Sequence, residues 1–216
     1  MLLAAGVAGA AFFSVIILSP TFDLPGRGFY EGLKPASPAI GQPSQSLAGG
    51  MPVESVQSIA SSEPASPGLP IRLKIPKIKV DTALDYVGLT PDGAVGTPKG
   101  PSTAAWFDLG PRPGNNGSAV ITGHYGHWKS GEGSVFDDLS KLKKGDSLFV
   151  EDEKGAAAAF VVREIRRYDP EASASEVFSS NDGKPHLNLI TCEGEWNDVS
   201  KTYSRRLVVF TDKENR

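Results

Sequence analysis

The region 69–216 is a series of short apolar runs separated by turn-forming residues. The run 71–75 alternates apolar and basic side chains, which is the period of a strand with one buried face. Pro76 follows, so we expect a sheet edge or a bulge there. Further strand-like runs lie at 78–80, 118–121, 147–151, 159–166, 187–191 and 207–210, and a short helix is expected within 134–142. Many short strands divided by turns are typical of a β-barrel or a β-sandwich, so the sequence predicts an all-β domain.

The composition agrees with a β-rich domain and excludes one class of partner. The 216 residues include 24 Gly and 17 Pro, which favour turns over long helices. The formal net charge is −3, and the basic residues are scattered along the chain. Proteins that bind nucleic acids need a basic face, so we expect no nucleic-acid partner.

The first 19 residues are almost continuously apolar and carry no charged side chain. A core helix of this length would show a polar stripe, so residues 1–19 are predicted to be a membrane span or a signal peptide. The small residues Ala4, Ala5 and Gly6 lie at the start of the segment, whereas a cleavage site would need them at its end. We therefore expect an uncleaved transmembrane anchor.

Residues 20–68 are rich in Pro, Ser and Ala, with Arg27 and Lys34 as their only cations. Such a segment buries too little apolar surface to offset the entropy lost on ordering, so it is predicted to be a disordered linker. Anchor, linker and the domain at 69–216 together predict a single-pass protein of the cell membrane with its domain outside the cell.

Cys192 is the only cysteine, and it ends the apolar run 187–191 before a polar, turn-forming stretch. We expect it at the C-terminal end of a strand, beside a loop. A lone cysteine cannot form an intramolecular disulfide, so it is either a small buried apolar residue or a free reactive thiol. A reactive thiol attacks as the thiolate and needs a base or a cation nearby.

His124 and His127 are candidate bases because they follow a predicted strand in the sequence Gly-His-Tyr-Gly-His. His186 is expected to be a partly exposed residue at the start of the cysteine strand. His124, His127 and Cys192 could also be three zinc ligands. No second cysteine or carboxylate stands at a recognisable ligand spacing, so we predict no metal.

Arg205 and Arg206 begin the last apolar run, and a guanidinium can hold a carbonyl group or a developing oxyanion. Side chains alternate along a strand, so only one of the two can face a given site. The alternative is that both arginines are surface charges beside a strand.

Four segments resemble the motifs of the sortases, cysteine transpeptidases of Gram-positive bacterial surfaces, in the order that the family uses. These segments are 71–78, 120–124, 189–192 and 205–209. The third matches the Thr-Leu-x-Thr-Cys signature except that Asn188 stands where the first threonine would be. The resemblance covers residues 69–211, nearly the whole predicted domain.

The resemblance implies a closed β-barrel of about eight strands with short helices and loops. It also implies Cys192 as nucleophile, His124 as general acid and base, and Arg206 as the arginine that steadies the oxyanion, with Arg205 as the alternative. The substrate site is expected to involve Thr191, His127 and Glu193, whose backbone N–H can add an oxyanion donor. We expect no cofactor; some sortases bind calcium, but no calcium ligands are matched in this sequence.

The implied reaction cleaves a sorting signal of the LPXTG type through a thioacyl-enzyme. The acyl group then passes to an amine of a cell-wall precursor or of a pilin, so LPXTG-type surface proteins are the expected acyl donors. The class is left open among classes F, D and E. Two alternatives remain: a hydrolytic cysteine peptidase and a non-catalytic, membrane-tethered β-domain.

Overall fold

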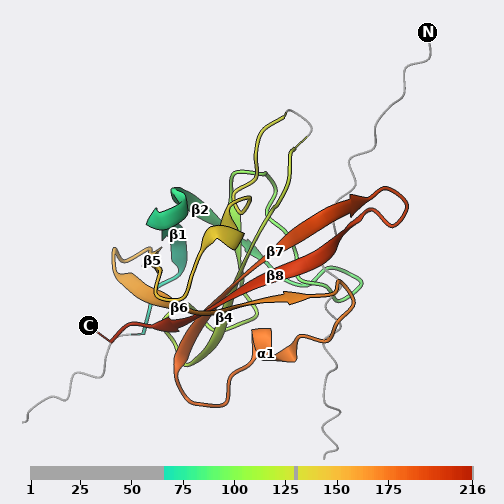
Figure 1. The fold of residues 1–216 in the computed structure, drawn as a ribbon. Helices are drawn as coiled ribbons and strands as arrows, with labels where there is room; N and C mark the ends of the chain where they lie inside the picture. The colour runs from blue at the N-terminus through green and yellow to red at the C-terminus, as the bar shows by residue number, and fades with distance from the viewer. Residues whose placement is uncertain (1–65, 129–130, 216) are drawn as a thin grey trace, which may run out of the picture. The chain divides into compact units, whose positions relative to one another are not determined.

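The protein is a closed barrel of eight strands, as the family resemblance implies (Figure 1). This computed structural model describes residues 66–128 and 131–215. The predicted anchor, and the predicted linker up to residue 65, lie outside the described residues. No helix within 66–128 or 131–215 is long and apolar enough to cross a membrane.

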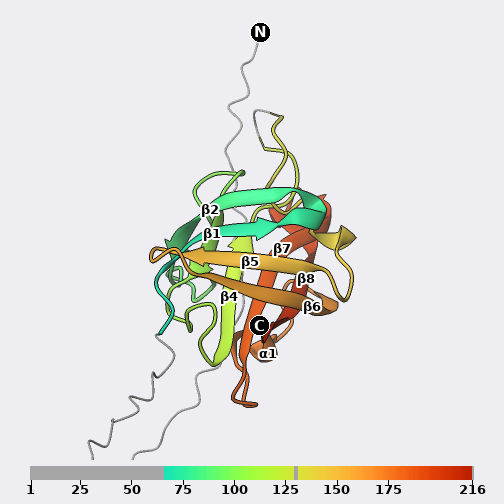
Figure 2. The same ribbon diagram turned by 90° about the vertical axis from the view of Figure 1, so that its left-hand side faces the viewer.

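The strands close in the order β1-β2-β3-β4-β7-β8-β6-β5. Their bounds are β1 Pro70–Ile75, β2 Val80–Val87, β3 Ala104–Phe107, β4 Gly117–Gly123, β5 Ser147–Asp152, β6 Ala157–Tyr168, β7 Pro185–Asn197 and β8 Thr202–Lys213. The helices are short: η1 Pro76–Ile78, η2 Leu139–Lys141 and α1 Ser175–Phe178. In Figure 2, β2, β1, β5 and β6 form the near wall, and β4, β7 and β8 lie behind them.

The first strand confirms the alternation from Arg72 to Ile75, although Ile71 is exposed, and the prediction for the next residues is wrong. Pro76 lies at neither an edge nor a bulge: it begins the 3-10 helix η1, where its missing N–H costs nothing. Lys79, which follows η1, has a left-handed backbone with a φ of 56°. The predicted strand 78–80 is therefore a turn, and β2 starts at Val80.

Two further elements differ from the prediction. The strand β3 was not expected, because all four of its side chains are buried and no alternation marks it. The helix expected within 134–142 is only the 3-10 turn η2. The domain also begins before residue 69, since the N–H of Gly68 donates to Asp152 (2.8 Å) and Lys154 donates to the carbonyl of Ser66 (3.1 Å).

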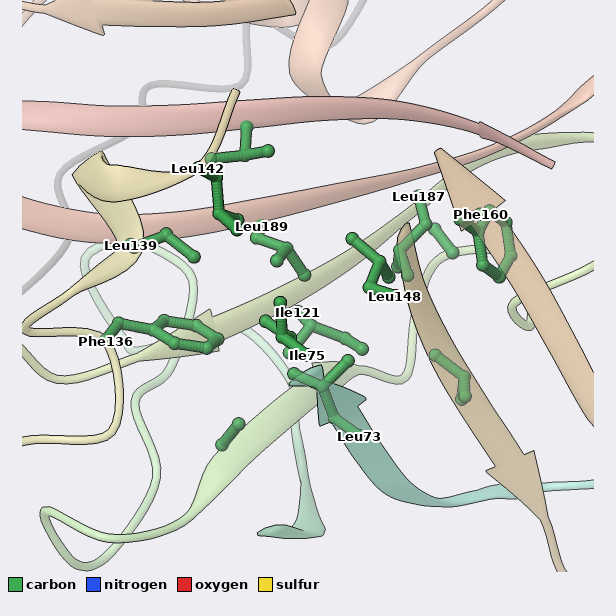
Figure 3. Close-up of a cluster of buried hydrophobic side chains, with 14 of the residues drawn as sticks. Leu73, Ile75, Ile121, Phe136, Leu139, Leu142, Leu148, Phe160, Leu187 and Leu189 are labelled. Atoms are coloured by element: carbon green, nitrogen blue, oxygen red, sulfur yellow. The ribbon is translucent and has the colours of Figure 1, made fainter. Parts of the chain in front are cut away.

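The inner cluster of apolar side chains fills the barrel (Figure 3). Its fully buried members include Leu73, Ile75, Ile121, Leu148 and Leu189, which come from four different strands. Phe136 and Leu139 close one end of the cluster from the segment between β4 and β5. Burial of so many large side chains is the main favourable term that holds the barrel closed.

A second cluster covers the opposite face of β4, β7 and β8, and we call it the outer cluster. Its buried members are Ala94, Val95, Phe107, Val120, Ala174, Val177, Ile190, Cys192, Val208 and Phe210. Side chains alternate along a strand, so Leu189 and Val209 face the barrel while Ile190 and Val208 face outward. Segments before β3 and around α1 pack on this outer face. Because they cover it, these strands are buried on both faces.

Candidate active site

The end of β4 and the middle of β7 bring the predicted histidine and cysteine to corresponding positions of two neighbouring strands. The two strands are parallel neighbours, and their register pairs Thr122 with Ile190. His124 and Cys192 each follow that pair by two positions. The buried hydroxyl of Thr191 donates to the carbonyl of Gly123 (2.8 Å), which fastens the two strands directly beside these residues.

Cys192 lies within a strand rather than at its end, which corrects the prediction. β7 continues to Asn197, and the turn expected after the cysteine is instead a register shift between Glu193 and Trp196. The side chain of Cys192 belongs to the outer cluster and is 5% exposed. Burial raises the pKa of the Cys192 thiol, and the nearby cation of Arg206 partly opposes that rise.

Arg206 lies directly opposite Cys192 in the β7–β8 register. Directly opposite residues of an antiparallel pair point to the same face of the sheet. The Arg206 side chain is 6% exposed and is held by three hydrogen bonds. Its Nη1 donates to the carbonyls of Tyr203 (3.2 Å) and Arg205 (3.1 Å), and its Nη2 donates to the hydroxyl of Thr202 (2.9 Å).

Arg205 faces the other side of β8. It is exposed and stands opposite Glu193 in the register. The guanidinium that the structure places beside the thiol is therefore that of Arg206.

His124 is half-buried, and one ring nitrogen has a defined partner. Its Nε2 lies 2.9 Å from the carbonyl oxygen of Pro98. A carbonyl only accepts, so in the neutral ring Nε2 carries the proton and Nδ1 holds the lone pair. The Trp128 ring packs edge-on against the imidazole, with the ring centres 5.0 Å apart. These contacts leave Nδ1 as the nitrogen that can accept a proton.

The loop that follows His124 is folded back by Asp137. One carboxylate oxygen of Asp137 accepts the N–H of Gly126 (2.7 Å) and the other accepts the N–H of Ser134 (2.8 Å). The Ser134 hydroxyl donates to the carbonyl of Gly126 (2.6 Å). Asp137 was not predicted from the sequence, because only the folded loop brings its carboxylate to Gly126. His127 lies on the same loop but is exposed.

Aromatic side chains cover the site from the loop and from the β7–β8 hairpin. Tyr203 packs edge-on against Tyr125 and Trp196, with ring centres 5.3 Å and 5.1 Å apart. Burial, and then the neighbouring Cys192, raise the pKa of the Tyr203 hydroxyl. A side chain on Gly126 would collide with that hydroxyl, so the glycine permits the close approach. Tyr203 was not predicted from the sequence either, since its place depends on the hairpin's register.

A small groove, which we call the α1 groove, lies on the outer face beside Arg206. It is lined mainly by apolar side chains, including Tyr168, Pro170, Val177, Phe178, Ile190 and Val208. The groove is narrow and partly open to solvent. Tyr168 stands opposite Arg206 in the β6–β8 register, so Tyr168, Arg206 and Cys192 form one row across three neighbouring strands. The groove is therefore lined by Arg206, the residue directly opposite Cys192.

The structure shows side-chain contacts within the barrel for two of the expected substrate residues. Thr191 is fully buried, and alternation along β7 directs it into the barrel, so its contact with Gly123 fastens strands and does not line a surface. The carboxylate of Glu193 forms a double hydrogen bond with Arg167 of β6 (2.6 and 3.0 Å). That pair joins the strands beside Cys192.

His186 was expected to be partly exposed, and that prediction is wrong. It is 4% exposed, with Asp182 and Asp212 on either side of its ring. Across 66–128 and 131–215, no three His, Cys, Asp or Glu side chains gather closely enough to hold a metal ion.

Comparisons with known proteins agree on the domain. A family model described as a sortase domain matches residues 73–214. Sortase C-1 from Actinomyces oris has a TM-score of 0.53 and 24% identity, over 67% of this chain and 73% of that chain. Sortase A of Corynebacterium diphtheriae, a lid mutant, has a TM-score of 0.53 and 22% identity, over 70% and 73%. Sortase C2 of the Group B Streptococcus Pilus Island 1 has a TM-score of 0.50 and 27% identity, over 67% and 73%. No curated protein sequence matches the chain.

Proposed function

The chain belongs to the sortase family, and on that basis we propose that it is a cysteine transpeptidase acting on LPXTG-type sorting signals. The observation that carries the proposal is the arrangement across three neighbouring strands: the thiol of Cys192 on β7, the guanidinium of Arg206 opposite it on β8, and His124 directly after the parallel strand β4. These groups supply a nucleophile, a cation for developing negative charge and a proton carrier.

In the first half of the reaction, the thiol proton moves to Nδ1 of His124 and the Cys192 sulfur attacks a peptide carbonyl carbon of the signal. The C–S bond forms as the carbonyl π electrons move to oxygen, and Arg206 stabilises the resulting oxyanion. The oxyanion then collapses, the peptide C–N bond breaks, and His124 gives its proton to the leaving amine. A thioacyl-enzyme on Cys192 remains.

In the second half, an amine attacks the thioester carbon and passes a proton to His124. Collapse of the second tetrahedral intermediate breaks the C–S bond, and the sulfur leaves as the thiolate. The product is a new amide between the acyl donor and the amine. In this proposal the amine belongs to a cell-wall precursor or to a pilin.

The apolar lining of the α1 groove is evidence for an acyl donor that presents apolar side chains. The Ile190 and Val208 floor of the groove suits the leucine and proline at the start of an LPXTG-type signal, and the groove opens beside Arg206, where the reacting carbonyl would lie. The partners that we propose are therefore surface proteins carrying such signals. We further propose that residues 1–19 anchor the enzyme in the cell membrane with the barrel outside.

The test is a product analysis with an LPXTG-type peptide and a panel of amines. Mass spectrometry should show peptide cleavage together with a new peptide–amine amide whose yield rises with the amine concentration. Cleavage that gives only the free acid at every amine concentration would instead identify a hydrolytic peptidase. No cleavage with any peptide would favour a non-catalytic domain.

A further inference from the structure

The outward face of β7 carries a row of four buried residues with different tasks. They are His186, Asn188, Ile190 and Cys192, spaced two apart so that they share one face of the strand. Ile190 and Cys192 belong to the outer cluster and to the proposed site. His186 and Asn188 are polar, and the proposed chemistry uses neither of them. Buried polar side chains of this kind are kept where they make specific hydrogen bonds.

Asn188 fastens the helix α1 to the outward face of β7. Its Nδ2 donates to the carbonyl of Val177 at 2.7 Å, and Val177 lines the α1 groove. The Asn188 Oδ1 is buried and has no donor among the described residues. An unpaired buried acceptor is costly, so the contact with Val177 is the favourable interaction that this side chain provides.

His186 holds the segment that follows α1 back to the strand. Its Nδ1 lies 2.8 Å from Asp212 Oδ1 on β8, and its Nε2 lies 3.0 Å from both oxygens of Asp182. A neutral imidazole has one N–H and can serve only one of these carboxylates. Both contacts are hydrogen bonds only when the ring is the doubly protonated imidazolium.

The other charged groups around His186 fit this arrangement. Arg163 of β6 donates to the same Asp212 oxygen at 3.0 Å. The hydrogen bond from His186, and then those from the Lys184 N–H and the Ser180 hydroxyl, hold the pKa of Asp182 well below its usual range. On β4, the residue opposite His186 is the uncharged Ser118. Arg166 and Glu176 line the pocket on which His186 borders, and they pair with each other at 3.7 Å.

The Asn188 contact lies in α1, and the His186–Asp182 contact lies in the segment that follows α1. Both therefore hold the part of the chain that forms the α1 wall of the groove. The chain passes through α1, whose Val177 and Phe178 line the α1 groove, and then through 179–184 to β7. We propose that His186 and Asn188 are positioning residues for this groove: they hold its α1 wall in place, and the wall loosens when His186 loses its second proton. The identity of the groove's ligand rests on the proposed function. The contacts by which His186 and Asn188 hold the α1 segment, which we call the clamp, can be tested without a ligand.

The substrate test uses a Cys192→Ala background, so that peptide binding is measured without turnover. A fluorescent LPXTG-type peptide is titrated from about pH 5 to about pH 9, the range over which a histidine changes charge. With His186 intact, Kd should rise about fivefold as the pH rises, whereas His186→Gln should bind about fivefold more weakly at every pH. Asp182→Asn, at an exposed position, should give the same loss with little effect on folding. Asp92→Asn, an exposed aspartate in the β2–β3 connection, is the matched control and should keep the pH profile of the background.

The second test needs no substrate. Hydrogen–deuterium exchange of the amides of 175–182, corrected for the intrinsic pH dependence of exchange, should show protection that falls about fivefold at high pH when His186 is present. In His186→Gln this protection should be low and independent of pH. Equal protection and equal Kd in His186→Gln and the control at every pH would overturn the proposal. If the peptide binds no variant, a pH-dependent loss of protection would still support the clamp, and only the proposed ligand would fail.

Discussion

Cys192 of β7 and Arg206 of β8 lie directly opposite each other and point to the same face of the sheet. Both are nearly fully buried, so the cation acts on the sulfur with little water between to screen it. Burial still dominates, and the pKa of the thiol is raised overall. A buried thiol beside a fixed cation is suited to forming a covalent intermediate whose oxyanion that cation then stabilises.

The neighbouring arginines provide a matched pair of variants. Arg206→Ala should lower kcat for an LPXTG-type peptide about 10²- to 10³-fold, the usual cost of removing one oxyanion donor. Arg205→Ala removes an exposed side chain on the other face, and it should change kcat by less than about threefold. Steady-state kinetics of the two variants decides which of the two arginines stabilises the oxyanion. Loss of turnover in Arg205→Ala alone would show that the wrong arginine has been assigned.

The reactivity of the thiol should depend on pH in a predictable direction. Because the pKa of Cys192 is raised, the thiolate is a minor species at neutral pH, and its alkylation by iodoacetamide should accelerate about tenfold per pH unit up to that pKa. In Arg206→Gln the cation that lowers the pKa is gone, so alkylation at a fixed pH should be slower still. Arg205→Gln should follow the wild-type profile. A thiol that is fully reactive below neutral pH would contradict the effect of burial.

Substitution of His124 should lower kcat/KM much more than substitution of His127. His124→Ala removes the proposed proton carrier and should lower kcat/KM about 10²- to 10⁴-fold. His127 is exposed on the same loop, so His127→Ala should cost about tenfold less than His124→Ala does. Both can be compared by peptide cleavage, with circular dichroism to confirm folding. Equal losses would place His127 in the reaction as well.

Thr191 should act through geometry rather than through contact with substrate. Thr191→Val keeps the shape of the side chain but leaves the Gly123 carbonyl without its buried donor, so the free energy of unfolding should fall by about 1–3 kcal/mol. Turnover should fall as well, because β4 and β7, which position His124 and Cys192, lose the hydrogen bond that joins them beside these residues. Thr191→Ser keeps the hydroxyl and should retain most of the activity. Urea denaturation and peptide cleavage together check this, and a Thr191→Ser variant as inactive as Thr191→Val would rule out the hydroxyl's role.

Strands with one polar face were predictable from sequence, and those without one were not. β1 was found because Arg72 and Lys74 alternate with the apolar residues Ile71, Leu73 and Ile75, of which Leu73 and Ile75 are buried. β3 was missed because all four of its residues are buried, and the strand expected at 78–80 was wrong because Pro76 begins a helical turn. Closure of the barrel also depends on the parallel pairs β2–β3 and β4–β7. Parallel strands are not joined by a tight turn, so the sequence contains no local pattern that predicts these pairs. The family resemblance supplied that closure, where periodicity alone left barrel and sandwich open.

The candidate site was predictable in its residue types but not in its contacts. Cys192 and His124 stood out by sequence, and the structure places them at one edge through the β4–β7 register. The choice between Arg205 and Arg206 needed the register of β8, which no single-strand pattern contains. The burial of His186 depends on Asp212, 26 residues away in sequence, so its surroundings could only be seen in the fold.

Cys192 is proposed to carry the acyl group, and mass spectrometry of the digested protein tests this assignment most directly. The wild-type protein is mixed with an LPXTG-type peptide, quenched in acid and digested, so that any thioester is located on its residue. An adduct with the mass of the acyl portion is expected on Cys192; it should disappear when an amine is added, and Cys192→Ala should never form it. Peptide cleavage that persists in a folded Cys192→Ala variant, or an amide product formed without any adduct on Cys192, would contradict it.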